Sequence, residues 1–105
     1  MPDIKTLNDN LRKTFNGGRV ILSQGICFKP TNEKAEILSE VRRFDKFTKR
    51  NDPYGEHDFG SFEYKGEKIY WKIDYYDKDY CYLSEDPSNP DVTNRVLTVM
   101  LASEY

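Results

Sequence analysis

Alternation of apolar and polar side chains between Lys68 and Tyr76 limits the fold of this chain more than any other feature of its sequence. A two-residue period is typical of a strand with one buried face. A second extended segment, residues 59–65, precedes it across a turn at Gly66, so the two together predict an antiparallel hairpin. One face of the later strand would carry Ile69, Trp71, Ile73 and Tyr75, and the other Tyr70, Lys72, Asp74 and Tyr76.

Two segments carry apolar residues at helical spacing. The first begins at Asp3 and stops at Asn16-Gly17-Gly18, because glycine tolerates the left-handed conformation that closes helices. The second follows Pro30, where Thr31 or Asn32 can cap the first turn. Each apolar stripe is expected to face the core. The stripes are Ile4, Leu7, Leu11 and Phe15 in the first helix, and Ile37, Leu38, Val41 and Phe44 in the second.

Three further segments complete the expected fold. Residues 19–28 are apolar around Gly25 and predict a buried strand that bends at the glycine. Residues 80–83 predict a third strand of a meander, and residues 91–101 predict a last, well-buried helix capped by Asp91. The sequence therefore predicts one α+β domain over residues 1–105, with a mostly antiparallel four-stranded sheet and three helices in the order α-β-α-β-β-β-α.

Length and composition point to a small protein of the cytoplasm. With 105 residues, 37% of them hydrophobic, the chain has material for a single modest core. It begins without the features of a signal peptide and has no apolar run of about 20 residues, so neither export nor a membrane partner is expected. Cys27 and Cys81 lack the close spacing of a metal or redox pair, and we expect two buried, reduced thiols.

The segment from Asn51 to Gly60 is the strongest candidate for chemistry. Glu56 and Asp58 flank the only histidine, and Asp52 and Asp74 could join them in a hard-cation or general-base site. A lone histidine gives no zinc set, however, and no phosphate-binding loop is present. We therefore predict no catalytic residue, metal or cofactor, and assign a structural role to the loop formed by Asp52, Pro53, Tyr54, Gly55, Glu56, His57 and Asp58.

Charge is divided unevenly along the chain and gives two candidate interaction surfaces. Residues 1–50 hold 11 Lys or Arg and 6 Asp or Glu, a balance of +5, whereas residues 51–105 hold 5 and 12, a balance of -7. An acidic, tyrosine-rich surface suits a basic protein groove. This predicted partner-binding surface comprises Asp74, Tyr76, Asp77, Asp79, Tyr80, Glu85 and Asp86. The alternative is a basic ridge for nucleic acid on the second helix, formed by Arg42, Lys46, Lys49 and Arg50.

Several long motifs resemble a known family. They are Asn51–Gly60 (NDPYGEHDFG), Trp71–Asp77 (WKIDYYD), Ser84–Pro87 (SEDP) and Arg95–Ala102 (RVLTVMLA), preceded by Leu7–Arg12 and Gly17–Val20. The sequence is similar to a small bacterial, plasmid and phage family catalogued as a domain of unknown function. That family includes members described as anti-CRISPR proteins, which block Cas9-type, type II effector nucleases.

The resemblance implies a role in evading host defence on a mobile genetic element in a bacterial cell. The expected function is non-catalytic inhibition of a type II effector or its guide RNA complex, by blocking DNA binding or cleavage. Two rivals remain open: a nucleic-acid-binding accessory protein that uses the basic ridge, and a metal-dependent enzyme centred on Glu56, His57, Asp58 and Asp74. Salt-sensitive binding to free nucleic acid would favour the first, and tight retention of a divalent metal the second.

Overall fold

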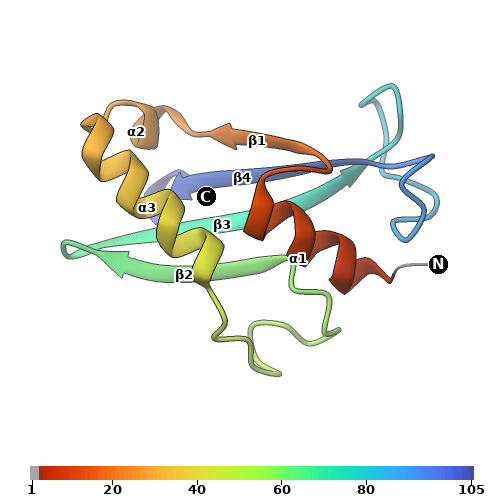
Figure 1. The fold of residues 1–105 in the computed structure, drawn as a ribbon, viewed down its shortest axis with the longest axis horizontal. Coiled ribbons are helices and arrows are strands. Elements are labelled where there is room, and N and C mark those ends of the chain that lie inside the picture. Colours follow the sequence, from red (N-terminus) through yellow and green to blue (C-terminus); the bar gives the residue numbers. More distant parts are fainter. Residues whose placement is uncertain (1–2) are drawn as a thin grey trace.

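The computed structural model describes residues 3–105 as a four-stranded sheet with helices on one face (Figure 1). Strand order is β1-β4-β3-β2; β2, β3 and β4 are antiparallel, and β1 runs parallel to β4. The α+β class, with three α-helices and four strands, is confirmed, but the sheet is mixed and a second short helix follows β1. The elements are α1 (Ile4–Thr14), β1 (Arg19–Leu22), α2 (Gln24–Cys27), α3 (Thr31–Arg43), β2 (Phe59–Tyr64), β3 (Glu67–Tyr76), β4 (Asn94–Leu101) and the 3₁₀-helix η1 (Ala102–Glu104).

The predicted hairpin is confirmed in β2 and β3. Lys65 and Gly66 form its two-residue turn, and both have the positive φ (50° and 80°) that such turns require. The alternation of β3 also holds, because Ile69 and Trp71 are fully buried on the helix side and Tyr70 lies on the opposite face. Gly60 lies opposite Trp71, and a Cβ atom there would approach the Trp71 Nε1 atom to 2.5 Å. The lack of a side chain at Gly60 therefore leaves room for the indole ring of Trp71.

Both predicted amphipathic helices form, with differences at their ends. The Asp3 side chain caps α1 by accepting a hydrogen bond from the Thr6 amide, and Phe15 rather than a glycine takes the left-handed position after its last turn. α3 begins at Thr31 without a side-chain cap, and Ile37 and Val41 face the core as expected. The helix ends at Arg43. The basic ridge predicted as one helical face is therefore wrong, because Lys46, Lys49 and Arg50 follow the helix in the loop to β2.

The last predicted helix is instead β4. This strand lies between β1 and β3, and five of its eight residues, all between Arg95 and Met100, are buried (pattern iBBBiBBi). The buried residues include Val96 and Met100 on the face opposite the helices, where neighbouring side chains leave them 5% and 6% exposed. A strand buried on both faces reads as a continuous apolar run, and periodicity cannot separate it from a buried helix. Alternation is present nevertheless: Leu97 and Val99 join the core, while Val96 and Met100 lie on the other face.

The expected long strand over residues 19–28 is also wrong beyond Leu22. Ser23 starts the short helix α2 by accepting a hydrogen bond from the Ile26 amide. Gly25 marks close packing rather than a bulge, since a Cβ atom there would meet the Leu101 side chain at 2.5 Å. Cys27 lies on this helix and is exposed. The expectation of two buried thiols is wrong at both positions.

Residues 80–83 do not form the predicted third strand of a meander. They belong to the β3–β4 loop, defined here as residues 77–93, and contact β3 through one isolated bridge between Tyr76 and Leu83. The Asp77 carboxylate organises this turn by accepting hydrogen bonds from the Asp79 and Cys81 amides. Tyr80 takes a left-handed φ of 59°, so the chain turns here instead of extending. Cys81 is exposed in the loop.

The core lies between the helices and the inner face of the sheet. Trp71 is its largest fully buried side chain, and Phe44 and Phe47 meet the indole edge-on at centroid distances of 5.5 and 6.1 Å. The fully buried members are Leu11, Ile26, Ile37, Val41, Ile69, Trp71, Leu97 and Val99. Within residues 3–105, no helix has the length and apolar character needed to span a bilayer.

Candidate binding surface

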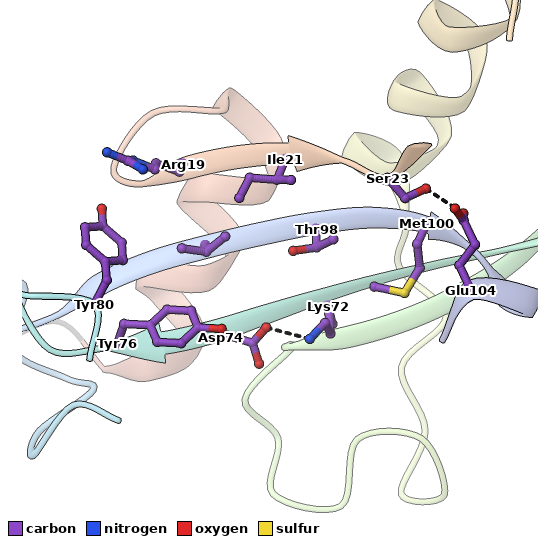
Figure 2. A pocket seen from close by; sticks show the side chains of 11 residues that line it. Arg19, Ile21, Ser23, Lys72, Asp74, Tyr76, Tyr80, Thr98, Met100 and Glu104 are labelled. Atoms are coloured by element: carbon purple, nitrogen blue, oxygen red, sulfur yellow. Dashed lines mark hydrogen bonds and ion pairs between the residues drawn. The ribbon is translucent and has the colours of Figure 1, made fainter. Parts of the chain in front are cut away.

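Among residues 3–105, no α-helix lies on the face of the sheet opposite α1 and α3, and only Glu104 of η1 borders it. A shallow groove of about 410 Å³ runs across this face from β1 to β3 (Figure 2). Ile21, Val96 and Met100 give it an apolar floor, and Ile21 remains 45% exposed. Polar and aromatic side chains surround that floor. They are Arg19, Ser23, Lys72, Asp74, Tyr76, Tyr80, Thr98 and Glu104.

The charged side chains around the groove, two positive and two negative, all make contacts within the chain. Lys72 Nζ lies 2.8 Å from Asp74 Oδ2, and this hydrogen bond raises the pKa of Lys72. Glu104 accepts hydrogen bonds from the Ser23 hydroxyl at 2.6 Å and from two backbone amides, which lower the pKa of its carboxyl group. The Arg19 guanidinium lies 4.8 Å from the centre of the Tyr80 ring. The groove is therefore near neutral, and its contacts with a partner would be largely apolar and aromatic.

An aromatic cluster extends the same face toward β2. Phe59, Tyr70 and Tyr105 meet edge to face, with centroid distances of 5.3, 5.4 and 6.2 Å between the pairs. Tyr105 is 75% exposed, so the cluster is open to solvent on one side. Together with the groove it forms a continuous uncovered sheet face that reaches from β1 to β2.

The β3–β4 loop stands at one end of this face and carries most of the predicted partner-binding residues. Tyr80 lines the groove, while Tyr82 and Leu83 are each 76% exposed. The Asp77 and Asp86 carboxylates stabilise turns, because each accepts hydrogen bonds from groups two to four residues later in the sequence. Among residues 3–105, no group pairs with the exposed side chains of Asp79 and Glu85.

The structure thus separates the seven predicted partner-binding residues by role. Asp74, Tyr76 and Tyr80 line the groove, and the Tyr76 and Tyr80 rings are 6.1 Å apart. Asp79 and Glu85 present free carboxylates, whereas Asp77 and Asp86 are structural. Sequence reasoning missed Ile21, Tyr82, Leu83 and Met100 as parts of this surface. The exposure of Tyr82 and Leu83 was not expected, because residues 80–83 were predicted to form a strand of the sheet.

The four residues of the basic alternative are exposed but share no helical face. Arg42 donates its Nε hydrogen to the Lys13 carbonyl at 2.9 Å and lies over the Phe15 ring, so its side chain joins α3 to α1. Lys46, Lys49 and Arg50 are placed by the loop after α3, where the Asn51 side chain donates to the Lys46 carbonyl.

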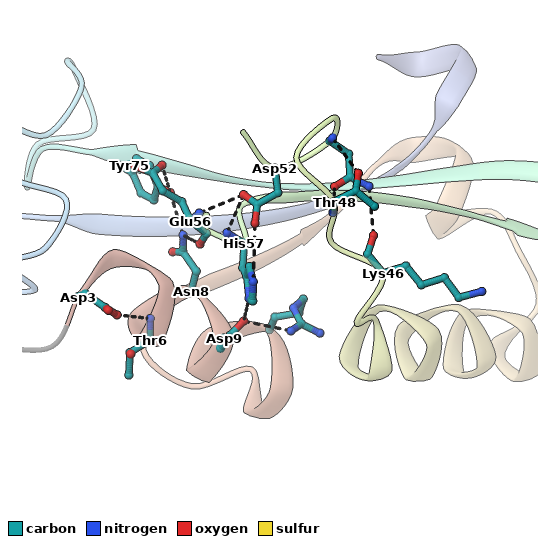
Figure 3. A network of polar contacts seen from close by, with 12 residues as sticks. Asp3, Thr6, Asn8, Asp9, Lys46, Thr48, Asp52, Glu56, His57 and Tyr75 are labelled. Carbon is teal, nitrogen blue, oxygen red and sulfur yellow. Dashed lines mark hydrogen bonds and ion pairs between the residues drawn. The ribbon is translucent and has the colours of Figure 1, made fainter. Parts of the chain in front are cut away.

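The loop from Asn51 to Gly60 is joined to α1 by a chain of polar contacts (Figure 3). Asp52, which is 8% exposed, accepts hydrogen bonds from the Glu56 and His57 amides. His57 Nδ1 lies 2.9 Å from Asp9 Oδ1, and the imidazole stacks flat on Phe47 at 3.8 Å. Asp9 also pairs with Arg12. These contacts tie the loop to α1 and to the edge of the core.

A second part of the network is more deeply buried. Asn8 donates to the Glu56 carbonyl and to the Tyr75 hydroxyl, and accepts from Arg95 Nε. Burial raises the pKa of Tyr75 and lowers that of Arg95. Burial also raises the pKa of Asp58, with the nearby carboxylates of Asp52 and Asp74 adding to the effect.

These contacts leave the metal-enzyme alternative without a coordination set. Asp74 lies on the uncovered face with Lys72, whereas His57 contacts α1 on the helix side. Among residues 3–105, no three His, Cys, Asp or Glu side chains are placed to hold a metal ion together. Sequence reasoning recognised the loop but missed its anchors Asn8, Asp9, Arg12 and Arg95, because their partners are distant in sequence.

A family comparison matches most, but not all, of the residues that form this surface. The sequence model of a family described as "Protein of unknown function (DUF3768)" matches residues 22–104, well over half of the chain. The chain belongs to the DUF3768 family. The match includes α3, β2, β3, β4 and the β3–β4 loop, but it begins after α1. No curated protein and no solved structure matches the sequence.

Proposed function

We propose that this DUF3768 protein is a non-catalytic binding protein that engages another protein through its uncovered sheet face and β3–β4 loop. The observation that carries the proposal is the exposure of Tyr82 and Leu83, 76% each, in the same loop as the exposed carboxylates of Asp79 and Glu85. Exposed aromatic and aliphatic side chains provide the desolvated anchors of protein interfaces. Carboxylates around them favour a partner whose contact surface is basic.

The partner class we propose to test first is a type II CRISPR effector nuclease with its guide RNA. Two features support this choice. The motifs resemble those of a family with members described as anti-CRISPR proteins, and CRISPR effectors hold nucleic acid in strongly basic channels that an acidic protein surface can occupy. Binding there would block DNA binding or cleavage without any chemistry by the inhibitor. The proposed place of action is the bacterial cytoplasm, where inhibition would protect a mobile element from the host defence.

The test is direct binding of the purified chain to a panel of type II effectors, each with and without guide RNA, together with DNA cleavage. The proposal predicts stoichiometric binding to at least one effector and loss of its DNA binding or cleavage. Raised salt should weaken the complex, because the contact joins opposite charges. Absence of binding across the panel, with tight salt-sensitive binding to free DNA or RNA, would contradict the proposal and favour the nucleic-acid alternative.

A further inference from the structure

The outer edge of β2, which no strand among residues 3–105 pairs with, is a second surface beside the proposed binding face. Ile73 donates its amide hydrogen to the Asp58 carbonyl at 2.8 Å, and the register continues as Phe59 opposite Lys72. Antiparallel pairs alternate between hydrogen-bonded and non-hydrogen-bonded, so the backbone groups of Gly60, Phe62 and Tyr64 point toward β3. Those of Phe59, Ser61 and Glu63 point away from the sheet. No described residue hydrogen-bonds to the outward groups of Ser61 and Glu63.

A groove runs along this edge between β2 and the end of α3. Two adjoining hollows, of about 340 and 400 Å³, share Glu40, Arg43 and Glu63 in their walls. Phe44 and Phe62 make the first hollow apolar at its base. Proteins usually protect an edge strand with proline, lysine, a bulge or a covering element. From Phe59 to Tyr64 β2 has neither proline nor lysine, and its pairing with β3 is regular.

We propose that this edge pairs with β2 of a second copy of the chain, in an antiparallel register centred on Phe62. The sheets of the two copies would then be continuous, with all helices on one side. The groove rim carries both positive and negative side chains, which favours a second copy over a partner whose surface has charge of only one sign. A two-fold axis places each surface patch against the same patch of the other copy, so that opposite charges can pair across the contact. The rim of the first hollow has both signs, with Glu40, Asp45 and Glu63 beside Arg43 and Lys46.

Side-chain chemistry selects this register. Centring on Glu63 would set two carboxylates face to face, and centring on Ser61 would set Glu63 against Phe59 of the second copy. Centring on Phe62 pairs the two Phe62 rings over the apolar hollow. It also places each Ser61 hydroxyl opposite the Glu63 carboxylate of the other copy, where the hydroxyl can donate a hydrogen bond. Every cross-strand pair in this register is favourable or neutral.

Sedimentation velocity of the full chain from micromolar to millimolar concentration tests this pairing. We expect a monomer–dimer equilibrium that Ser61→Glu weakens roughly tenfold, because two like-charge pairs form across the two-fold axis. Combining Ser61→Glu with Glu63→Lys should restore or tighten the dimer, because both pairs become attractive. Gln24→Glu adds the same charge at an exposed position on α2, which follows β1 at the opposite edge of the sheet, and should leave the equilibrium unchanged.

Urea unfolding confirms that each variant is folded, and amide exchange gives a readout that does not depend on any substitution. The outward amides of Ser61 and Glu63 should exchange fast when the protein is dilute and become protected as it dimerises. A chain that stays monomeric at millimolar concentration overturns the proposal. A dimer that Ser61→Glu leaves intact, or in which those two amides stay unprotected, overturns it too, since another surface would then form the contact.

Discussion

Arg95 donates its Nε hydrogen to Asn8 Oδ1 across 2.9 Å and so joins strand β4 to helix α1. Both residues are buried, with exposures of 3% and 0%. The Asn8 amide completes the junction by donating to the Glu56 carbonyl and the Tyr75 hydroxyl. One asparagine therefore holds together a helix, two strands and the loop before β2.

Asn8→Ala should lower the free energy of unfolding by about 1–3 kcal/mol, because Arg95 Nε and the Glu56 carbonyl lose their hydrogen-bond partner. The Arg95 Nη2 atom keeps the Pro87 carbonyl, and the Tyr75 hydroxyl keeps the Glu56 carboxylate. Urea unfolding followed by circular dichroism measures this loss. Asn10→Ala is the matched control, since Asn10 lies on the exposed side of the same helix and its substitution should cost less than about 0.5 kcal/mol. Equal losses in the two variants would contradict a central role for Asn8.

Gly55 has a φ of +65°, and a Cβ atom there would have no neighbour within 4 Å. The cost of substitution is therefore backbone strain alone. Gly55→Val should destabilise the protein by about 1–3 kcal/mol, whereas Gly55→Asn should cost less, because asparagine tolerates the left-handed region. Thermal unfolding of the two variants compares them. A Gly55→Val variant that melts like the parent but no longer binds its partner would make this loop a functional site.

The pattern of one-sided alternation revealed the hairpin, and helical spacing revealed α1 and α3. Those elements keep one face in solvent, so their periodicity survives in the sequence. In β4 the residues of both faces are buried, Val96 and Met100 included, and this near-continuous apolar run suggested a helix. The parallel pairing of β1 with β4 depends on contacts between residues nearly 80 positions apart, such as Arg19 with Val96, for which local pattern gives no signal.

Only part of the candidate site could be predicted from the sequence, because local patterns show which residues are present but not which contacts they make. Tyr76, Tyr80 and the acidic residues were visible as a composition bias, but which carboxylates are free depends on turn geometry. Nothing in the sequence distinguishes Asp77 from Asp79, yet the Asp77 carboxylate accepts hydrogen bonds from the Asp79 and Cys81 amides. The uncovered sheet face could not be recognised until β4 was known to be a strand.

Asp58→Asn should stabilise the protein at neutral pH. Burial raises the pKa of Asp58 in the folded state above its ordinary value of 3.8, so folding favours the protonated form. As pH rises from 3.8 through the folded pKa, the parent should lose stability relative to the variant; above the folded pKa the difference should stay constant. Urea midpoints between about pH 3 and 8 measure it. A variant less stable than the parent at neutral pH would contradict this burial effect.

Both cysteines should be reactive and dispensable. Cys27 and Cys81 are exposed, on α2 and in the β3–β4 loop, so a thiol reagent should modify two groups in the folded protein. Replacing both with serine should change the free energy of unfolding by less than about 1 kcal/mol and leave partner binding intact. Loss of binding in the folded double variant would show that a thiol takes part in function.

Exposed loop charge gives the most direct test of the proposed binding surface. Asp79→Lys with Glu85→Lys reverses two carboxylates that no described group holds, and it spares Asp77 and Asp86, which stabilise turns. The matched control changes net charge equally on the helix side, with Asp45→Lys, Ala35→Lys and Ser39→Lys, all at exposed positions.

The deciding measurement is the affinity of the parent and these two variants for whichever effector–guide complex binds the parent. The loop variant should bind on the order of tenfold to a hundredfold more weakly, because like charges would face each other across the interface, while the control binds like the parent. If the folded loop variant keeps the parental affinity, the β3–β4 loop does not contact the partner, and the proposed binding surface is wrong.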